Sequence, residues 1–378
     1  MNLRLIKNIE YSKCYPYDST LVLQTSEDNY TLGDYQGIKL TLFNILENST
    51  KEVASSIKKY DFVEVEYISE RADYLYFVSA EFSKENEIKI MLYQHNILDE
   101  STEIVFEQEV SLEYLSNNKI KVYVLNDEFA FVQAISTSGK ISMCELISFD
   151  EKNVVNISSS DILNYGIKDI QRIDGNNYVL RIGADDRLIV NVNIKQFISE
   201  LLLGKEDISY EIIEENDGDK YYAYVKTVNK VVIYSRFYFS DNKEEIVFYD
   251  YELKSSKVRM NLSDGRTSSK ENAYMIGDVP YMLDYIYDYE SNEDTGHYVL
   301  INLNSSTLEY SFEPGVEVKY IYDNIVITMQ SQIKGILKRS ADYICAYALP
   351  NLESPVINEK GQFAGCIAND DEILIFSN

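Results

Sequence analysis

The chain repeats one short apolar strand pattern about every 50 residues from one end to the other. In most copies a basic or polar residue is followed by Ile or Leu and then by apolar residues at alternating positions. A period of two is typical of a β-strand. The seven copies lie at residues 37–42, 87–92, 140–144, 187–190, 245–248, 297–300 and 343–346. Successive copies begin 46 to 58 residues apart. A repeat of this length that is filled with strands predicts a radial or stacked β architecture.

Each recurring strand has similar neighbours. A predicted hairpin precedes it and a fourth strand follows it, as residues 103–106 follow 87–92. The predicted hairpins pair residues 63–68 with 74–78, 121–124 with 129–132, 170–173 with 178–180, and 318–321 with 325–327. Asp and Asn at the turns tolerate the positive φ angles of tight hairpins. The resulting unit is a four-stranded meander.

The two ends of the chain complement each other. Counting hairpins gives eight units, from residues 9–11 with 20–23 to residues 362–366 with 373–376. The last hairpin has no third or fourth strand after it, whereas residues 3–6 precede the first hairpin, where an outer strand would lie. A unit shared between the two termini would remove exposed sheet edges. We therefore favour eight units over the alternative of seven.

In period and strand order the chain resembles the β-propeller superfamily, with WD40-like four-stranded blades, and the resemblance covers essentially the whole sequence. It implies an all-β fold and a single propeller domain over residues 1–378. The chain has no Trp and no Gly-His…Trp-Asp pair, and it has no kelch-type double glycine. The resemblance therefore carries over no functional residue.

One segment departs from the strand pattern. Residues 194–203 have helical spacing and end at Gly204, a residue suited to a helix C-cap. We expect a short helix inserted near residues 194–204, between the two outer strands of its blade. It would cover a sheet edge, and a docking role is the second interpretation.

Composition and charge limit the classes of partner. The 378 residues are 45% hydrophobic, which is ample for a packed core, and 33 of them are Tyr. The net charge of −27 repels phosphate backbones and anionic lipids, so we expect neither nucleic-acid nor membrane binding. The same charge suits a basic partner or a cation.

The sequence predicts a reduced, cytoplasmic protein. The start of the chain lacks the apolar region of a secretory signal, and no stretch approaches 18 apolar residues. The four Cys lie far apart, and Cys144 and Cys345 fall inside apolar strands, where we expect them to be buried.

The sequence offers little catalytic chemistry. His95 and His297 are the two histidines, and the Gly-x-Ser-x-Gly and phosphate-loop motifs are absent. Because the chain has no helical α/β half, we exclude a hydrolase domain of the prolyl-peptidase type within it. We expect no cofactor and no metal. The acidic segments 214–219 and 290–294 lack the spacing of a calcium loop and are interpreted as solvated turns.

One set of tyrosines is a candidate ligand site. They occupy equivalent places in the first strand of the hairpins, where strand ends would line the mouth of a propeller channel. The favoured interpretation is that these rings fill the wedge between blades. The set is Tyr11, Tyr67, Tyr123, Tyr224 and Tyr320.

These observations favour a non-enzymatic propeller that binds a protein or peptide partner through one face of the ring. The alternative is small-ligand binding, carbohydrate in type, or a glycoside-type enzyme at the channel mouth with paired carboxylates. The sequence does not separate the first hypothesis from a structural protein that acts only within a complex.

Overall fold

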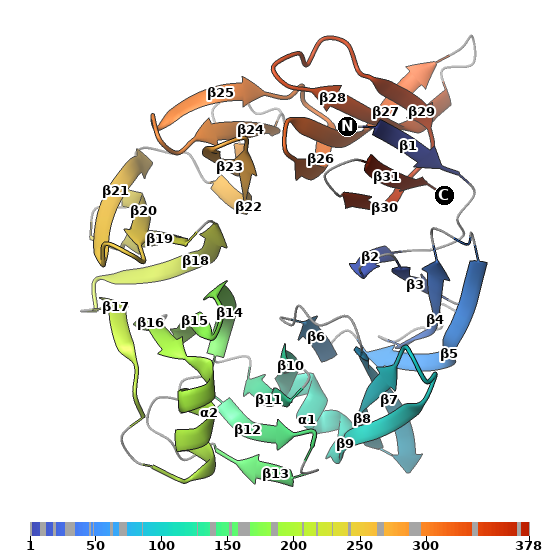
Figure 1. Ribbon diagram of the computed structural model, residues 1–378, viewed down its shortest axis with the longest axis vertical. Helices are drawn as coiled ribbons and strands as arrows, with labels where there is room; N and C mark the ends of the chain where they lie inside the picture. The colour runs from blue at the N-terminus through green and yellow to red at the C-terminus, as the bar shows by residue number, and fades with distance from the viewer. Residues whose placement is uncertain are drawn as a thin grey trace. The chain divides into compact units, whose positions relative to one another are not determined.

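The protein has an all-β fold, and the part of the chain that the structure describes contains two short helices (Figure 1). The computed structural model describes residues 2–7, 13–17, 20–26, 35–44, 47, 49–60, 63–67, 74–84, 86–126, 128–136, 141–150, 153–157, 167–182, 188–205, 208–216, 218–228, 230–240, 243–262, 268–286, 296–334, 339–368 and 372–377. The chain divides into two compact units, Tyr17–Asn216 and Met1–Pro16 with Asp217–Asn378. Each unit is described by itself.

The unit Tyr17–Asn216 contains four sheets, ordered β3-β4-β5, β7-β8-β9, β13-β12-β11-β10-β6 and β14-β15-β16-β17. Its strands are β3 (Thr20–Ser26), β4 (Tyr35–Asn44), β5 (Ser49–Tyr60), β6 (Val63–Tyr67), β7 (Tyr74–Lys84), β8 (Glu87–Asn96), β9 (Thr102–Ser111), β10 (Asn118–Asn126), β11 (Phe129–Ser136), β12 (Ile141–Ser148), β13 (Asn153–Asn156), β14 (Ile167–Asp174), β15 (Asn177–Ile182), β16 (Leu188–Asn193) and β17 (Glu211–Glu215). Its helices are α1 (Leu112–Asn117) and α2 (Ile194–Leu202), and β2 (Lys13–Tyr17) precedes β3 in the chain.

The other unit also contains four sheets, ordered β18-β19-β20-β21, β22-β23-β24-β25, β26-β27-β28-β29 and β1-β31-β30. Its strands are β1 (Asn2–Ile6), β18 (Lys220–Val228), β19 (Val231–Tyr238), β20 (Lys243–Asp250), β21 (Ser255–Leu262), β22 (Ser268–Ile276), β23 (Val279–Ile286), β24 (His297–Asn302), β25 (Thr307–Ser311), β26 (Val316–Tyr322), β27 (Ile325–Lys334), β28 (Arg339–Ala348), β29 (Ile357–Lys360), β30 (Phe363–Ala368) and β31 (Glu372–Ser377). The eight sheets confirm the predicted count of eight.

The recurring sequence pattern marks an inner strand of seven sheets. Its copies fall on β4, β8, β12, β16, β20, β24 and β28. Each of these strands has a hydrogen-bonded neighbour on both sides. Their apolar positions include Ile88, Val190 and Leu300, none of which is exposed to solvent. The pattern recurs because a strand in this place must be apolar on both faces of its sheet.

The core of each unit lies between consecutive sheets. In β10, Val122 and Val124 pack in a cluster with the sheet β7-β8-β9, whereas Tyr123 and Leu125 pack in a second cluster with β14, β15, β16 and α2. Successive residues of a strand point to opposite faces, so one strand contributes to both clusters. The sheet between them is therefore covered on both sides.

The terminal sheet joins the two ends of the chain. β1 pairs with β31 in parallel, with Leu3 opposite Ile373 and Leu5 opposite Ile375. The prediction of a blade shared by the termini is confirmed. β1 lies directly beside β31 as the third strand of this sheet, rather than in the outer fourth place.

One predicted hairpin is wrong. Residues 63–68 and 74–78 do form strands, β6 and β7, but β6 pairs in parallel with β10 of the neighbouring sheet, with Val65 opposite Val122. Alternating residues predict a strand and carry no information on its partner, which explains the error. The hairpins β10–β11, β14–β15, β26–β27 and β30–β31 form as predicted.

The helix expected near residues 194–204 is present as α2. Asn193 caps it by accepting a hydrogen bond from the Gln196 amide, and Gly204 follows its end with a φ of 62°. Cys144 and Cys345 are buried as expected. No helix in the described part of the chain is both long and apolar enough to cross a membrane. The single domain over residues 1–378 stays a prediction.

A buried glutamine connects two consecutive sheets. Gln133 of β11 is fully buried, and its Oε1 accepts a hydrogen bond from the Ile167 amide of β14 at 3.1 Å, while its Nε2 donates to the Ile167 carbonyl. The side chain therefore provides the backbone of the next sheet with the partners that another strand would provide.

We predict that Gln133→Leu lowers the free energy of unfolding by about 1–3 kcal/mol, because it leaves the buried Ile167 amide without an acceptor. Urea unfolding measures the loss. Gln362→Ala is the control, since Gln362 is exposed and donates to Asp342 at the surface, and its effect should stay within about 0.5 kcal/mol. Equal effects of the two variants would contradict the bridging role.

Candidate functional site

The structure describes the side chains of two of the five candidate tyrosines. Tyr11 lies outside the described residues, and for Tyr67 and Tyr224 the structure describes the strands β6 and β18 but not the side chains. Tyr123 is fully buried, and Tyr320 is half-buried. The ligand-binding role of the set stays a prediction.

Both described tyrosines lie between sheets of their own unit. The Tyr123 hydroxyl donates to the backbone carbonyls of Ile167 and Lys168, each at 3.1 Å. Tyr320 packs on the cluster formed by β27, β28, β30 and β31, and burial raises its pKa to about 12. These placements agree with the interpretation that the rings fill the wedge between sheets.

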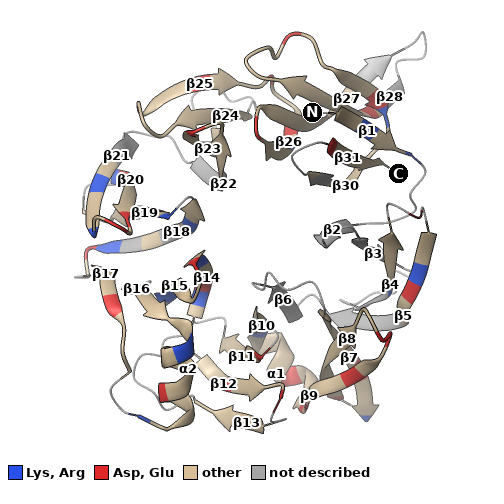
Figure 2. Ribbon diagram, in the orientation of Figure 1, with Lys and Arg blue, Asp and Glu red and all other residues tan. Residues whose placement is uncertain are grey.

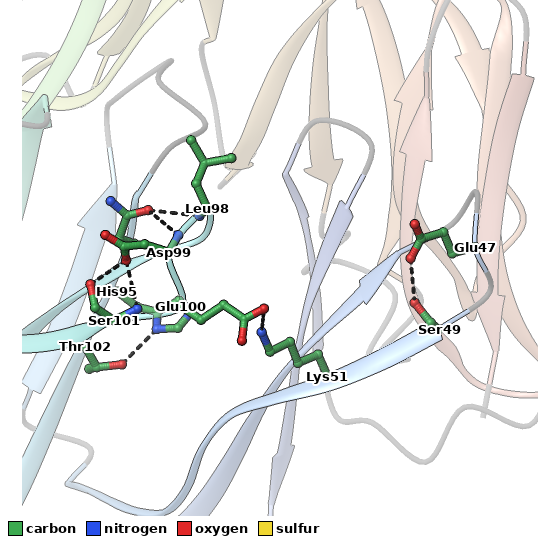
Figure 3. Close-up of polar contacts among 10 residues, drawn as sticks. Glu47, Ser49, Lys51, His95, Leu98, Asp99, Glu100, Ser101 and Thr102 are labelled. Carbon is green, nitrogen blue, oxygen red and sulfur yellow. Dashed lines mark hydrogen bonds and ion pairs between the residues drawn. The ribbon is translucent and has the colours of Figure 1, made fainter.

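Several polar side chains of the unit Tyr17–Asn216 meet at the turn between β8 and β9 (Figure 3). Asn96 Oδ1 accepts hydrogen bonds from the amides of Leu98 at 2.9 Å and Asp99 at 3.2 Å. Asp99 Oδ1 accepts from the amide of Ser101 at 2.9 Å and from its hydroxyl at 2.5 Å. Glu100 adopts a φ of 62°. Short polar side chains thus satisfy the backbone of this turn.

His95 lies at the base of this turn. It is 4% exposed, and its Nδ1 forms a hydrogen bond with the Thr102 hydroxyl, 2.8 Å away on the opposite strand. Burial lowers the pKa of His95, and the positive charge of Lys51 lowers it further. The imidazole is therefore neutral at pH 7.

An ion pair connects the turn to a second sheet. Lys51 of β5 pairs with Glu100, and Figure 3 shows the two side chains extending toward each other. Both side chains are about half exposed, so the pair stabilises the fold by less than about 1 kcal/mol. Its effect is to orient the exposed turn relative to β5.

The arrangement contains part of a nucleophile–base pair. A neutral imidazole bonded to an exposed hydroxyl is the first requirement of such chemistry. The second is a carboxylate that orients the imidazole, and here the neighbouring Asp99 uses its Oδ1 to hold Ser101. The cluster is therefore a stabilised turn and not an assembled catalytic triad.

Sequence reasoning assigned His95 no catalytic or ligand-binding role and missed this cluster. The available signal was local, because Asn96, Asp99 and Ser101 follow His95 with the spacing of side chains that cap turns. The ion pair between Lys51 and Glu100 joins segments that are far apart in the sequence, so the local sequence pattern does not predict it.

Within the described residues, no group of three or more His, Cys, Asp or Glu is placed to hold a metal ion. The acidic segment 290–294 lies outside those residues. In the segment 214–219, Asp219 accepts hydrogen bonds from the amide and the hydroxyl of Ser240.

Comparison with solved structures identifies the fold. A prolyl endopeptidase structure, from a study of inter-domain dynamics in catalysis and specificity, aligns over 97% of this chain and 53% of that chain, with a TM-score of 0.53 and 8% identity. The β-propeller domain of the Trilobed protease from Pyrococcus furiosus aligns over 91% of this chain and 99% of that chain, with a TM-score of 0.45 and 10% identity. The fold is a β-propeller.

The propeller spans about half the length of the prolyl endopeptidase that it matches. An oligogalacturonate lyase in complex with manganese aligns over 89% of this chain and 96% of that chain, with a TM-score of 0.48 and 10% identity. No family model and no curated protein sequence matches the chain.

These comparisons correct the functional prediction. The prolyl endopeptidase structure that aligns over 97% of this chain is that of an enzyme. The hypothesis of a non-enzymatic scaffold is therefore wrong. It rested on the lack of a catalytic motif, and a propeller within an enzyme need not carry one.

We predict that the stability contributed by His95 depends on pH. The unfolded chain takes up a proton below about pH 6.5, whereas the buried imidazole resists protonation, so this contribution decreases as the pH falls below that value. The difference in urea midpoint between the wild type and His95→Gln should therefore shrink from pH 7.5 to pH 5.5. A difference that is constant across this range would contradict the burial of a neutral imidazole.

Proposed function

We propose that this chain is the propeller part of an enzyme that hydrolyses peptides, in which it admits and selects the substrate while a separate part performs catalysis. One observation supports this most directly: the propeller matches 53% of a prolyl endopeptidase over 97% of its own length. The rest of the prolyl endopeptidase does not align with this chain.

The chemistry of the described residues agrees with a division of labour. His95 pairs with Thr102, and Asp99 holds Ser101, so these groups stabilise a turn. The sequence carries no Gly-x-Ser-x-Gly motif, which marks the nucleophile of α/β-hydrolases. A propeller of this composition contributes surface and charge, while the nucleophile comes from the catalytic part.

The charge of the chain favours basic peptides as the substrate class. The net charge of −27 attracts Lys- and Arg-rich segments and repels acidic ones, and it increases the rate of encounter at low salt. This attraction is screened over about 8 Å at physiological ionic strength. Selection by charge should therefore weaken as salt is added.

The blades are proposed to be WD40-like in form, on the basis of the four-strand order repeated in the sheets. The partners of the chain are proposed to be its peptide substrates and the catalytic part, with no nucleic acid and no membrane among them, because of the acidic charge. A reduced, cytoplasmic location is proposed from the cysteine spacing.

Extract complementation tests the proposed function. Cells that produce this protein are compared with cells from which its gene is deleted, using internally quenched fluorogenic peptides with charges of about +4, 0 and −4. We expect the deletion extract to hydrolyse the basic peptide more slowly, and the purified chain to restore the rate while it cleaves none of the peptides alone. Unchanged hydrolysis in the deletion extract would overturn the proposal, and cleavage by the purified chain alone would overturn the division of labour.

A further inference from the structure

Three large apolar side chains are exposed close to the end of α2. Leu203 is 71% exposed, Tyr210 is 42% exposed and Ile212 is 48% exposed. Leu203 directly follows α2, Tyr210 directly precedes β17, and Ile212 is the second residue of β17. We call these three residues together with β17 the α2–β17 edge.

A buried carboxylate holds this surface in place. The amide of Ser209 donates to Glu200 Oε2 at 2.6 Å, and the amide of Lys205 donates to the Glu200 carbonyl at 3.1 Å. Both ends of the segment between α2 and β17 are therefore attached to one turn of the helix. The Ser209 amide, followed by Gln196, lowers the pKa of Glu200 to about 2, so the attachment is intact at neutral pH.

β17 is an edge strand. It is the last strand of the sheet β14-β15-β16-β17, and among the described strands it pairs with β16 alone (Figure 1). An edge strand presents backbone N–H and C=O groups that can pair with a further strand. Two isoleucines lie within its five residues, Glu-Ile-Ile-Glu-Glu, so it also presents apolar contacts.

The charge of this edge selects what can pair with it. Glu211, Glu214 and Glu215 belong to β17, which has no Lys or Arg (Figure 2). Glu211 also accepts a hydrogen bond from Asn191. The unit Tyr17–Asn216 holds 36 Asp and Glu and 17 Lys and Arg, a net charge of −19 out of the total of −27. Like charges on paired strands destabilise the pair, so a second copy of β17 is repelled.

We infer that the α2–β17 edge docks an extended basic segment of a partner polypeptide, in which Lys or Arg alternates with apolar residues. Backbone hydrogen bonds to β17 would give affinity, as in other complexes where a peptide adds a strand to a sheet. In the register with β16, Glu211 and Glu214 share one face of the sheet and Ile212 lies on the other. The Lys and Arg side chains pair with the two glutamates, while the apolar side chains cover Ile212 and Tyr210. The charges that exclude a second copy are the ones that attract this partner.

A labelled ten-residue peptide of alternating Lys and Val is the probe, and an alternating Glu and Val peptide is its control. Fluorescence anisotropy measures binding to the purified chain at about 50 and 300 mM salt. We expect the Lys peptide to bind, to bind about tenfold more weakly at the higher salt, and the Glu peptide not to bind. Absence of Lys-peptide binding at the lower salt would overturn the inference.

Ile212→Lys locates the site, because it places a positive charge at the centre of the edge. We expect it to weaken binding of the Lys peptide at least tenfold. Leu308→Lys is the matched control: Leu308 is 50% exposed on β25, a five-residue strand at the edge of a sheet in the other unit. Unchanged binding by Ile212→Lys, or an equal loss in both variants, would overturn the assignment to β17. Both residues are exposed, so the urea midpoints should match that of the wild type.

Analytical ultracentrifugation of the chain alone tests whether a second copy of the chain binds at the α2–β17 edge. A monomer at micromolar concentration supports the exclusion of a second copy. A dimer that Ile212→Lys dissociates would show that the edge pairs with itself, and it would overturn the choice of a basic partner. None of these measurements depends on peptide hydrolysis, so their failure is distinct from failure of the proposed enzyme.

Discussion

Packing between consecutive sheets is the constraint on which the rest of this structure depends. The sheet that contains β10 has two apolar faces: Val122 and Val124 belong to one cluster, Tyr123 and Leu125 to the next. Fully burying one such side chain stabilises the fold by roughly 1.5–3 kcal/mol. A sheet without its neighbours would lose this contribution on both faces, so the sheets of a unit depend on one another.

The same packing determines where polar chemistry occurs. Inside the clusters, polar groups bridge sheets, as Gln133 and Tyr123 do at Ile167, and they are not available to a ligand. Polar groups near solvent collect at turns and edges, as at the β8–β9 turn and at β17. A propeller built this way can present charge and docking surface while its partner supplies a catalytic nucleophile, which is the arrangement proposed for this chain.

Some parts of the fold could be predicted because they depend on local pattern. The strand repeat, the α2 segment and the shared terminal blade follow from alternation, helical spacing and the two incomplete ends. Pairing across the chain left no such pattern: β6 lies beside β10, and Lys51 lies beside Glu100, because tertiary packing brings them together. The functional error had a different cause, since the absence of a catalytic motif was taken as the absence of an enzyme.

Hydrogen exchange of the backbone amides, followed by mass spectrometry, tests the dependence of the sheets on one another most directly. The inner strands β8, β12 and β16 belong to consecutive sheets of one unit. If each sheet needs its neighbours, these strands should open together and exchange at similar slow rates. Exchange of one of them hundreds of times faster than the others, with the remaining two still protected, would contradict the account.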